Sequence, residues 1–304
     1  MSHSRGKELI IMELKNGFYT ALGTPINSDG SIVESSLRKQ IEMQIEYGAS
    51  GLLILGSMGA QCAITNSACV RAVEIAVDAV KGRLPLFVGV MDNSVERVCE
   101  RIDALDGAEI DGVVVTNPFY YAVTDVKTLI NWYTKIADRS PYPVYMYDLP
   151  GVAKSKVTIA VIDGIINHKN IKGMKTADWE LIKNIERKYP DADFTCLYSG
   201  LDTFDYANFM GIKKNLDGMF CCTPKNGRKL YDAVEAGDYT AARAALDNIL
   251  LMRNTMAASD IFPAFTHCMN LIGCEGNFHE DFRIPLDDER KKLIEDTMRK
   301  IGEI

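Results

Sequence analysis

The chain has 304 residues, of which 47% are hydrophobic and 25% are charged, and its formal net charge is −7 at pH 7. This composition is that of an ordinary globular protein with a large core, and it excludes an intrinsically disordered chain. A negatively charged chain without basic clusters lacks the positive surface that binds nucleic acid or an anionic membrane, so we expect neither as a partner.

The start of the chain, MSHSRGKELIIMELKNG, contains no apolar core long enough for a signal peptide, and no later segment approaches the roughly 18 apolar residues of a membrane span. Eight cysteines are scattered without a CxxC pair, which fits reduced thiols in a reducing compartment. Four histidines occur without an HxH or HExxH pair, which argues against a metal site. We therefore expect a cytoplasmic protein without disulfides or a bound metal.

Short runs rich in β-branched residues alternate with amphipathic stretches of helix length, which is the signature of βαβ units. Several of these runs are apolar almost throughout, as expected for parallel strands that are covered on both faces. The predicted strands are, in chain order, 18–26, 51–56, 84–90, 111–118, 142–150, 171–177, 194–200 and 217–222.

Helical patterns lie between these strands, with apolar residues recurring every three or four positions and a glycine near the end. The clearest of them are 34–49, 66–82 and 94–107. Eight strand–helix units close most naturally into a (β/α)8 TIM barrel, an α/β fold. The alternative is a two-domain doubly wound fold, whose usual GxGxxG fingerprint is missing.

The predicted organisation is one continuous domain. The barrel covers residues 1–223 and is preceded by a short N-terminal tail at 1–15. Residues 224–304 are expected to form the last barrel helix and a C-terminal helical extension. The helical patterns of this part lie near 224–236, 238–257, 259–273 and 287–302.

In a (β/α)8 barrel the reacting groups lie at the carboxyl ends of the strands and in the loops that follow them. Lys175, in the sixth predicted strand, is the most suggestive residue at these ends. An amine held among apolar side chains has its charged form disfavoured, which makes it a nucleophile that can form a Schiff base. The alternative is a lysine that extends from the strand end to solvent.

Tyr147 precedes Lys175 by 28 residues, close to one strand–helix–strand step, so both side chains can point into the same mouth from adjacent strands. Schiff-base chemistry needs a proton shuttle, and a phenol beside the nitrogen can supply and remove protons. The alternative for Tyr147 is a core tyrosine whose hydroxyl is satisfied within the protein.

The run GSMGA at 56–60 follows the second predicted strand. Its glycines allow backbone amides to turn toward a bound anion, and Ser57 adds a hydroxyl donor. A carboxylate would fit there, although a glycine-rich turn between a strand and a helix is also simple geometry.

These residues together resemble the dihydrodipicolinate synthase and N-acetylneuraminate lyase superfamily of Schiff-base aldolases that act on pyruvate. The resemblance covers nearly the whole chain and rests on four motifs in family order. They are GSMG (56–59), NPFYY (117–121), YDLPG (147–151) and GMKTA (173–177).

The resemblance implies that Lys175 is the Schiff-base lysine, Tyr147 the acid/base phenol and Tyr120 a relay tyrosine. It also implies a homo-oligomer, usually a dimer or a dimer of dimers, because a tyrosine of this segment often reaches into the neighbouring subunit's site. The substrate-binding residues implied by position are Gly56, Ser57, Met58, Gly200, Asp202 and Cys222.

Several positions depart from the family pattern. The family usually has a second hydroxyl where this chain has Met58 and a glutamate where it has Ala60, so the carboxylate site has one donor fewer. Asp148 replaces the asparagine commonly found after the tyrosine. Val152 stands where dihydrodipicolinate synthases carry an arginine for the carboxylate of the aldehyde partner.

Sialic-acid lyases bind sugar hydroxyls with an acidic pair after strand seven and a serine after strand eight. Here the corresponding residues are Asp202, Thr203 and Cys222, so half of that set remains. A small hydroxylated aldehyde is therefore the expected partner of pyruvate.

The predicted function is a carbon–carbon lyase in which Lys175 forms an imine with pyruvate or a 2-keto-3-deoxy acid. No metal or organic cofactor is required, because the iminium is itself the electron sink. The alternatives are dihydrodipicolinate synthase proper, a keto-acid dehydratase that uses the same imine, and a catalytically weak paralogue that binds a keto acid. A zinc-dependent aldolase on the same barrel is disfavoured by the histidine pattern.

Overall fold

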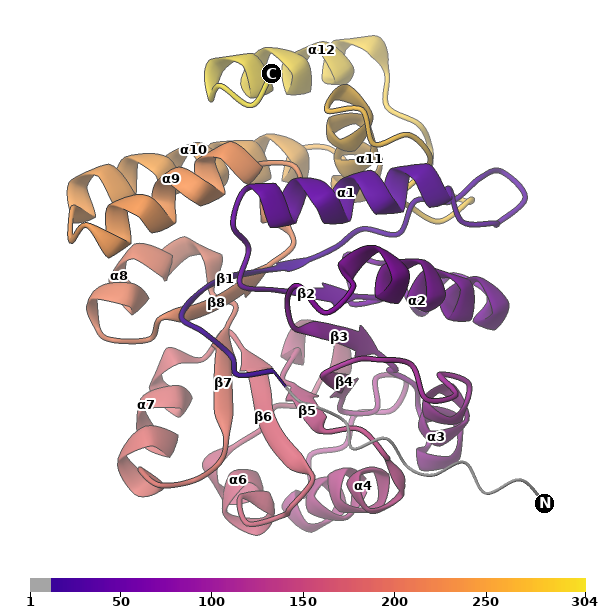
Figure 1. The fold of residues 1–304 in the computed structure, drawn as a ribbon, viewed down its shortest axis with the longest axis vertical. Coiled ribbons are helices and arrows are strands. Elements are labelled where there is room, and N and C mark those ends of the chain that lie inside the picture. Colours follow the sequence, from indigo (N-terminus) through magenta and orange to yellow (C-terminus); the bar gives the residue numbers. More distant parts are fainter. Residues whose placement is uncertain (1–11) are drawn as a thin grey trace.

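The computed structural model describes residues 12–304, in which parallel strands close into a barrel in the order β1 to β8 (Figure 1). The predicted TIM barrel is therefore confirmed. Its strands are β1 (Gly17–Ala21), β2 (Gly51–Ile54), β3 (Leu86–Gly89), β4 (Gly112–Thr116), β5 (Val144–Tyr147), β6 (Ile171–Thr176), β7 (Thr195–Tyr198) and β8 (Lys214–Asp217).

Helices alternate with the strands and cover the outside of the barrel (Figure 1). No helix within residues 12–304 is long and apolar enough to cross a membrane. The helices up to β8 are α1 (Glu34–Glu46), α2 (Asn66–Val80), α3 (Val95–Asp103), α4 (Val126–Arg139), α5 (Pro150–Ala153), α6 (Ile159–Ile165), α7 (Trp179–Lys188) and α8 (Phe204–Phe209).

The predicted C-terminal helices are also present. They are α9 (Pro224–Glu235), α10 (Tyr239–Ala257), α11 (Ile261–Leu271) and α12 (Asp288–Lys300). Helices α9 and α10 pack side by side, and α11 and α12 lie beyond them at the top of Figure 1. The predicted boundary at 223/224 falls at the first residue of α9, whereas most of the predicted tail at 1–15 lies outside the described residues.

Short polar side chains set where several helices begin. The side chains of Thr65, Ser94 and Asp125 each accept a hydrogen bond from the backbone N–H three residues later, at the starts of α2, α3 and α4. Such caps satisfy one of the amides that have no partner within the helix. Local sequence therefore fixes these boundaries.

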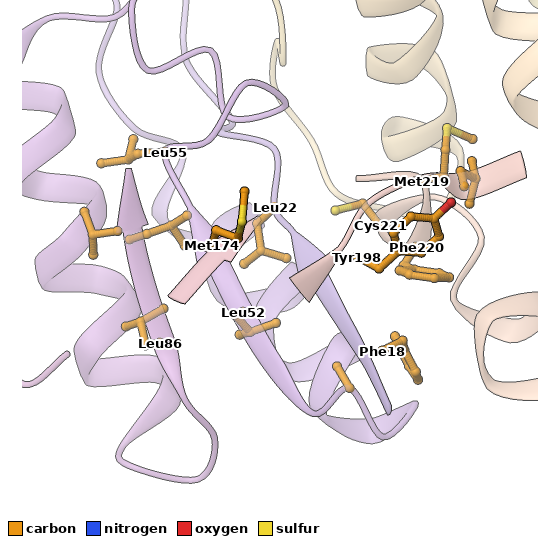
Figure 2. Packing of buried hydrophobic residues seen from close by; sticks show 14 of the residues in the cluster. Phe18, Leu22, Leu52, Leu55, Leu86, Met174, Tyr198, Met219, Phe220 and Cys221 are labelled. Carbon is orange, nitrogen blue, oxygen red and sulfur yellow. The ribbon is translucent and has the colours of Figure 1, made fainter. Parts of the chain in front are cut away.

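Successive side chains along each strand face opposite sides, so the barrel strands contribute to two separate cores. Large inward side chains, among them Tyr19, Phe87 and Tyr145, fill the barrel interior. Outward side chains pack under the helices, as Figure 2 shows for Phe18 and Leu52. The barrel is consequently solid below its mouth, and only the carboxyl ends of the strands offer space for chemistry.

The predicted eighth strand at 217–222 is wrong, since β8 ends at Asp217. The observed strand, KNLD, is short and mostly polar, so a search for apolar runs does not find it. The apolar residues Met219–Cys221 form a buried 3-10 turn instead. Phe220 packs there against Phe18, with ring centres 5.1 Å apart, so burial beneath the helices explains the apolar run.

The C-terminal tail is fastened to the first turn of α9 by Glu303. Its buried carboxylate accepts hydrogen bonds from the amides of Lys225 (3.2 Å) and Asn226 (2.9 Å) and from Asn226 Nδ2 (2.6 Å). A carboxylate at a helix N-terminus satisfies unpaired amides and interacts favourably with the helix dipole. This contact joins the last residues of the chain to the helix that follows β8.

Glu303→Ala should lower the free energy of unfolding by about 2–3 kcal/mol, because it leaves buried amides of α9 without acceptors. Urea denaturation of the variant and the wild type measures the difference. Glu295→Ala is the control, since it removes only an exposed partner of Arg299 and should leave the midpoint nearly unchanged. Equal midpoints for Glu303→Ala and wild type would contradict the anchoring role.

Candidate active site

A row of three side chains points into the barrel mouth from β4, β5 and β6. The strand register pairs Thr116 with Tyr147 and Tyr147 with Lys175. All three point inward, because Val114 and Tyr145, two residues earlier on their strands, belong to the barrel interior. The Lys175 Nζ atom lies 4.3 Å from the centre of the Tyr147 ring. The structure thus brings the predicted lysine and tyrosine together.

The Lys175 side chain is buried, at 7% exposure, yet none of the described residues forms an ion pair with its amine. Lys172, on the same strand, pairs with Asp193. Burying an ammonium group without an ion pair is unfavourable even beside an aromatic ring, so this arrangement indicates function rather than stability.

Asp217 at the end of β8 is an acid that the sequence analysis missed. Burial raises the pKa of its carboxyl, and the positive charges of Lys175 and Arg253 oppose that rise. Its Oδ1 atom accepts a hydrogen bond from the Met219 amide at 2.8 Å. Because the eighth strand was predicted at 217–222, Asp217 was expected at the start of that strand rather than at its end.

The loop after β2, which carries the GSMGA motif, is held in a strained shape. Leu55 and Ala60 have left-handed φ values of 55° and 49°. Such backbone costs about 1–3 kcal/mol for residues other than glycine and is concentrated at functional sites. Gly89 on β3 makes room for the loop, since a Cβ atom there would lie 1.9 Å from the Leu55 carbonyl oxygen.

The three predicted residues of this loop lie in different surroundings. Gly56 is buried, Ser57 is exposed to solvent and Met58 is partly buried. Met58 packs against the inner core, and its side chain fills the space next to Gly218, just after β8. A thioether therefore occupies this part of the mouth, next to the end of β8.

The residues predicted after β7 and β8 are either partly buried, paired within the protein or fully buried. Gly200 is partly buried, and a Cβ atom there would clash with the Tyr198 hydroxyl. Asp202 is engaged by Arg253 of α10, whose Nη1 and Nη2 atoms donate to its two oxygens at 2.6 and 2.7 Å. Cys222 is 0% exposed within the outer core, so its side chain does not reach the mouth.

Tyr120 lies in the loop after β4 and is 71% exposed. Its ring packs edge-on against Tyr121 at 4.8 Å, and its amide donates to Asn93 Oδ1 at 2.7 Å. In the described part of the chain, no hydrogen bond or ring contact joins it to Tyr147. The loop therefore presents this phenol to the outside of the single chain.

Thr116 is a second residue that the sequence analysis missed. Its hydroxyl is buried and has no hydrogen-bond partner among the described residues. The only signal in the sequence was its place at the inward-facing end of β4, beside Tyr147. Residues 12–304 contain no group of three His, Cys, Asp or Glu side chains that could hold a metal.

Comparison with known proteins gives a consistent family. The model of the dihydrodipicolinate synthetase family matches residues 14–301. The 4-hydroxy-tetrahydrodipicolinate synthase of Methylobacterium radiotolerans is 26% identical over 94% of this chain and 95% of its own length. The enzyme of the same name from Syntrophus aciditrophicus is 29% identical over 91% of this chain and 95% of its own length.

Two solved structures with a similar fold illustrate the range of named proteins that share it. A prophage protein of the dihydrodipicolinic acid synthase family from E. coli K12, in complex with pyruvate, superposes with a TM-score of 0.87. It is 23% identical and covers 96% of this chain and 100% of its own. The N-acetylneuraminate lyase of Proteus mirabilis has a TM-score of 0.86 at 17% identity, with 96% and 100% covered.

Proposed function

The chain belongs to the dihydrodipicolinate synthetase family of carbon–carbon lyases, and we propose that it forms a Schiff base between Lys175 and a 2-keto acid. The proposed donor is pyruvate or a 2-keto-3-deoxy acid, and the bond made or broken joins the carbon next to the former carbonyl to the carbon of the aldehyde. The observation that carries the proposal is the buried amine of Lys175, which lies beside the Tyr147 ring in the barrel mouth and forms no ion pair with any of residues 12–304.

In the proposed reaction the neutral amine of Lys175 attacks the keto carbon, and Tyr147 donates a proton to the hydroxyl that leaves as water. The resulting iminium accepts electrons from the adjacent C–H bond, whose proton passes to the Tyr147 phenolate, and an enamine forms. The enamine carbon then attacks the aldehyde while Tyr147 returns the proton to the aldehyde oxygen. Hydrolysis of the new iminium releases the product and the lysine amine. The reverse sequence cleaves the same bond, without a metal or organic cofactor.

The remaining predicted residues have supporting roles in this proposal. Ser57, with the amides of the Gly56–Met58 turn, holds the carboxylate of the keto acid. Tyr120 acts as a relay across a homodimer or homotetramer interface, which fits a phenol exposed in the single chain. Eight free cysteines support a reducing, cytoplasmic compartment.

Two observations bear on the aldehyde partner. Val152 on α5 is 50% exposed and offers no charge to a second carboxylate. Asp202 is already paired with Arg253, and the Thr203 hydroxyl is hydrogen-bonded to the Tyr198 hydroxyl at 2.6 Å. With both side chains engaged, few groups remain for the many hydroxyls of a large sugar. We therefore propose that the aldehyde partner is a hydroxylated aldehyde smaller than an acetylated sugar. Dihydrodipicolinate synthase proper is the second candidate, favoured by the names of the relatives.

Incubation with pyruvate and borohydride should attach a reduced pyruvyl group to Lys175 and to no other lysine. Peptide mapping by mass spectrometry locates the adduct. Lys172 is the control within the same peptide region, because its amine is held by Asp193. An adduct on Lys172 would refute the assignment, and no adduct on the folded protein would favour a binding paralogue instead.

Tyr147→Phe should slow the exchange of the pyruvate methyl protons with D2O by roughly 100-fold or more, the scale of a lost general acid or base. The ring that packs the strand end is retained, so circular dichroism should match that of the wild type. Proton NMR follows the exchange. Tyr206→Phe, on the exposed face of α8, is the matched control with unchanged exchange. Unaltered exchange in Tyr147→Phe would move the shuttle to Tyr120.

Small hydroxylated aldehydes should exceed aspartate semialdehyde by about tenfold in kcat/KM at one fixed pyruvate concentration. A hydrogen bond to a charged group is worth about 1.5–3 kcal/mol, and Val152 cannot supply one. Val152→Arg should raise the activity with aspartate semialdehyde, whereas Val152→Leu should not. If aspartate semialdehyde ranks first in the wild type by an order of magnitude, the protein is a dihydrodipicolinate synthase proper and our proposed aldehyde is wrong.

A further inference from the structure

A second row of polar side chains lies directly behind the row that points into the mouth. It consists of Asn117, Asp148 and Thr176, each the residue that follows a member of the inward row. All three are buried, with Asp148 at 4% exposure. Because successive strand residues face opposite sides, any shift of one strand end moves a member of both rows together.

Asp148 occupies the centre of this second row and binds β6 at two points. Its amide donates to the Lys175 carbonyl at 2.9 Å, and its Oδ2 atom accepts from the Thr176 hydroxyl at 2.9 Å. Its Oδ1 atom accepts from the Val157 amide at 2.9 Å. One residue therefore ties the strand of Tyr147 to the strand of Lys175 and to the loop that returns from α5.

Neighbouring hydrogen bonds extend this connection to β4. Asn117 Nδ2 donates to the Ser155 hydroxyl at 2.9 Å, and the Tyr133 hydroxyl donates to Asn117 Oδ1 at 2.6 Å. The Asp178 amide donates to Thr176 Oγ1 at 3.0 Å. We name Asn117, Asp148, Ser155 and Thr176 the polar belt.

The belt needs a carboxylate at its centre. Both oxygens of Asp148 face donors, the Val157 amide and the Thr176 hydroxyl. An asparagine side chain has a single acceptor oxygen, so it could accept from either the Val157 amide or the Thr176 hydroxyl, and its NH2 group would face the other donor. Burial raises the pKa of the Asp148 carboxyl, and the two hydrogen bonds that it accepts oppose that rise.

We propose, building on the proposed function, that Asp148 is a positioning residue that holds Tyr147 and Lys175 at the separation required for proton transfer. Its carboxylate touches neither the substrate nor the reacting atoms and acts through the two strand ends. A displacement of about 1 Å between reacting groups can reduce a rate by about 100-fold, so a small relaxation of the belt is enough to slow the reaction.

The first test compares Asp148→Asn with Asp111→Asn, using pyruvate as the probe. Asp111 is also a buried carboxylate with two backbone donors, the amides of Met12 and Leu86 at 2.8 Å, but it lies at the amino end of the barrel. Both variants should lose thermal stability. Asp148→Asn should slow methyl-proton exchange at least tenfold while borohydride trapping still reaches the wild-type extent. Asp111→Asn should keep exchange within twofold.

A second pair of variants covers the case in which Asp148→Asn does not fold. Thr176→Ser keeps the hydroxyl that donates to Asp148 and should keep exchange within threefold, whereas Thr176→Val removes it and should slow exchange at least tenfold. Equal exchange in both Thr176 variants, or equal slowing in Asp148→Asn and Asp111→Asn, would overturn the positioning role. Absence of trapping in the wild type would instead refute the proposed function, on which this role depends.

Discussion

The register of β4, β5 and β6 in a closed parallel barrel is the constraint on which the site depends. It sets Thr116, Tyr147 and Lys175 side by side, at a height where the inner core ends and the mouth begins. In a closed barrel a strand cannot slip alone, because a shift of one residue would turn its inward side chains outward against two neighbours. The separation of phenol and amine is thus a property of the whole barrel.

The same frame explains how the protein sustains locally unfavourable features. The buried amine of Lys175, which forms no ion pair within the described residues, and two left-handed residues in the loop after β2 each cost free energy. They are concentrated on the carboxyl side of the barrel, whereas the two hydrophobic cores below and around it are continuous. Strain at the mouth is therefore offset by packing that takes no part in the chemistry.

The sequence alone was sufficient to predict the features that depend on local residue patterns. The strand and helix alternation gave the barrel, and the spacing from Tyr147 to Lys175 gave their shared mouth. The polar strand β8 was missed because it lacks an apolar pattern: its buried Asn215 accepts hydrogen bonds from Asn208 of α8 and Tyr231 of α9. The pairing of Asp202 with Arg253 joins residues 51 positions apart, and no local signal in the sequence announces such a contact.

Two apolar side chains bear on how a charged substrate could be held. Met58 packs against the inner core beside Gly218, and Val152 on α5 is half exposed, so neither side chain can form a hydrogen bond to a substrate's charge. In a less polar surrounding the attraction between opposite charges is stronger, because less of it is screened. In the proposed reaction, an iminium on Lys175 and the carboxylate of the same keto acid would stabilise each other more strongly there. Such an internal charge pair would need fewer donors to hold the acid, while Met58 and Val152 offer no charge to a second carboxylate.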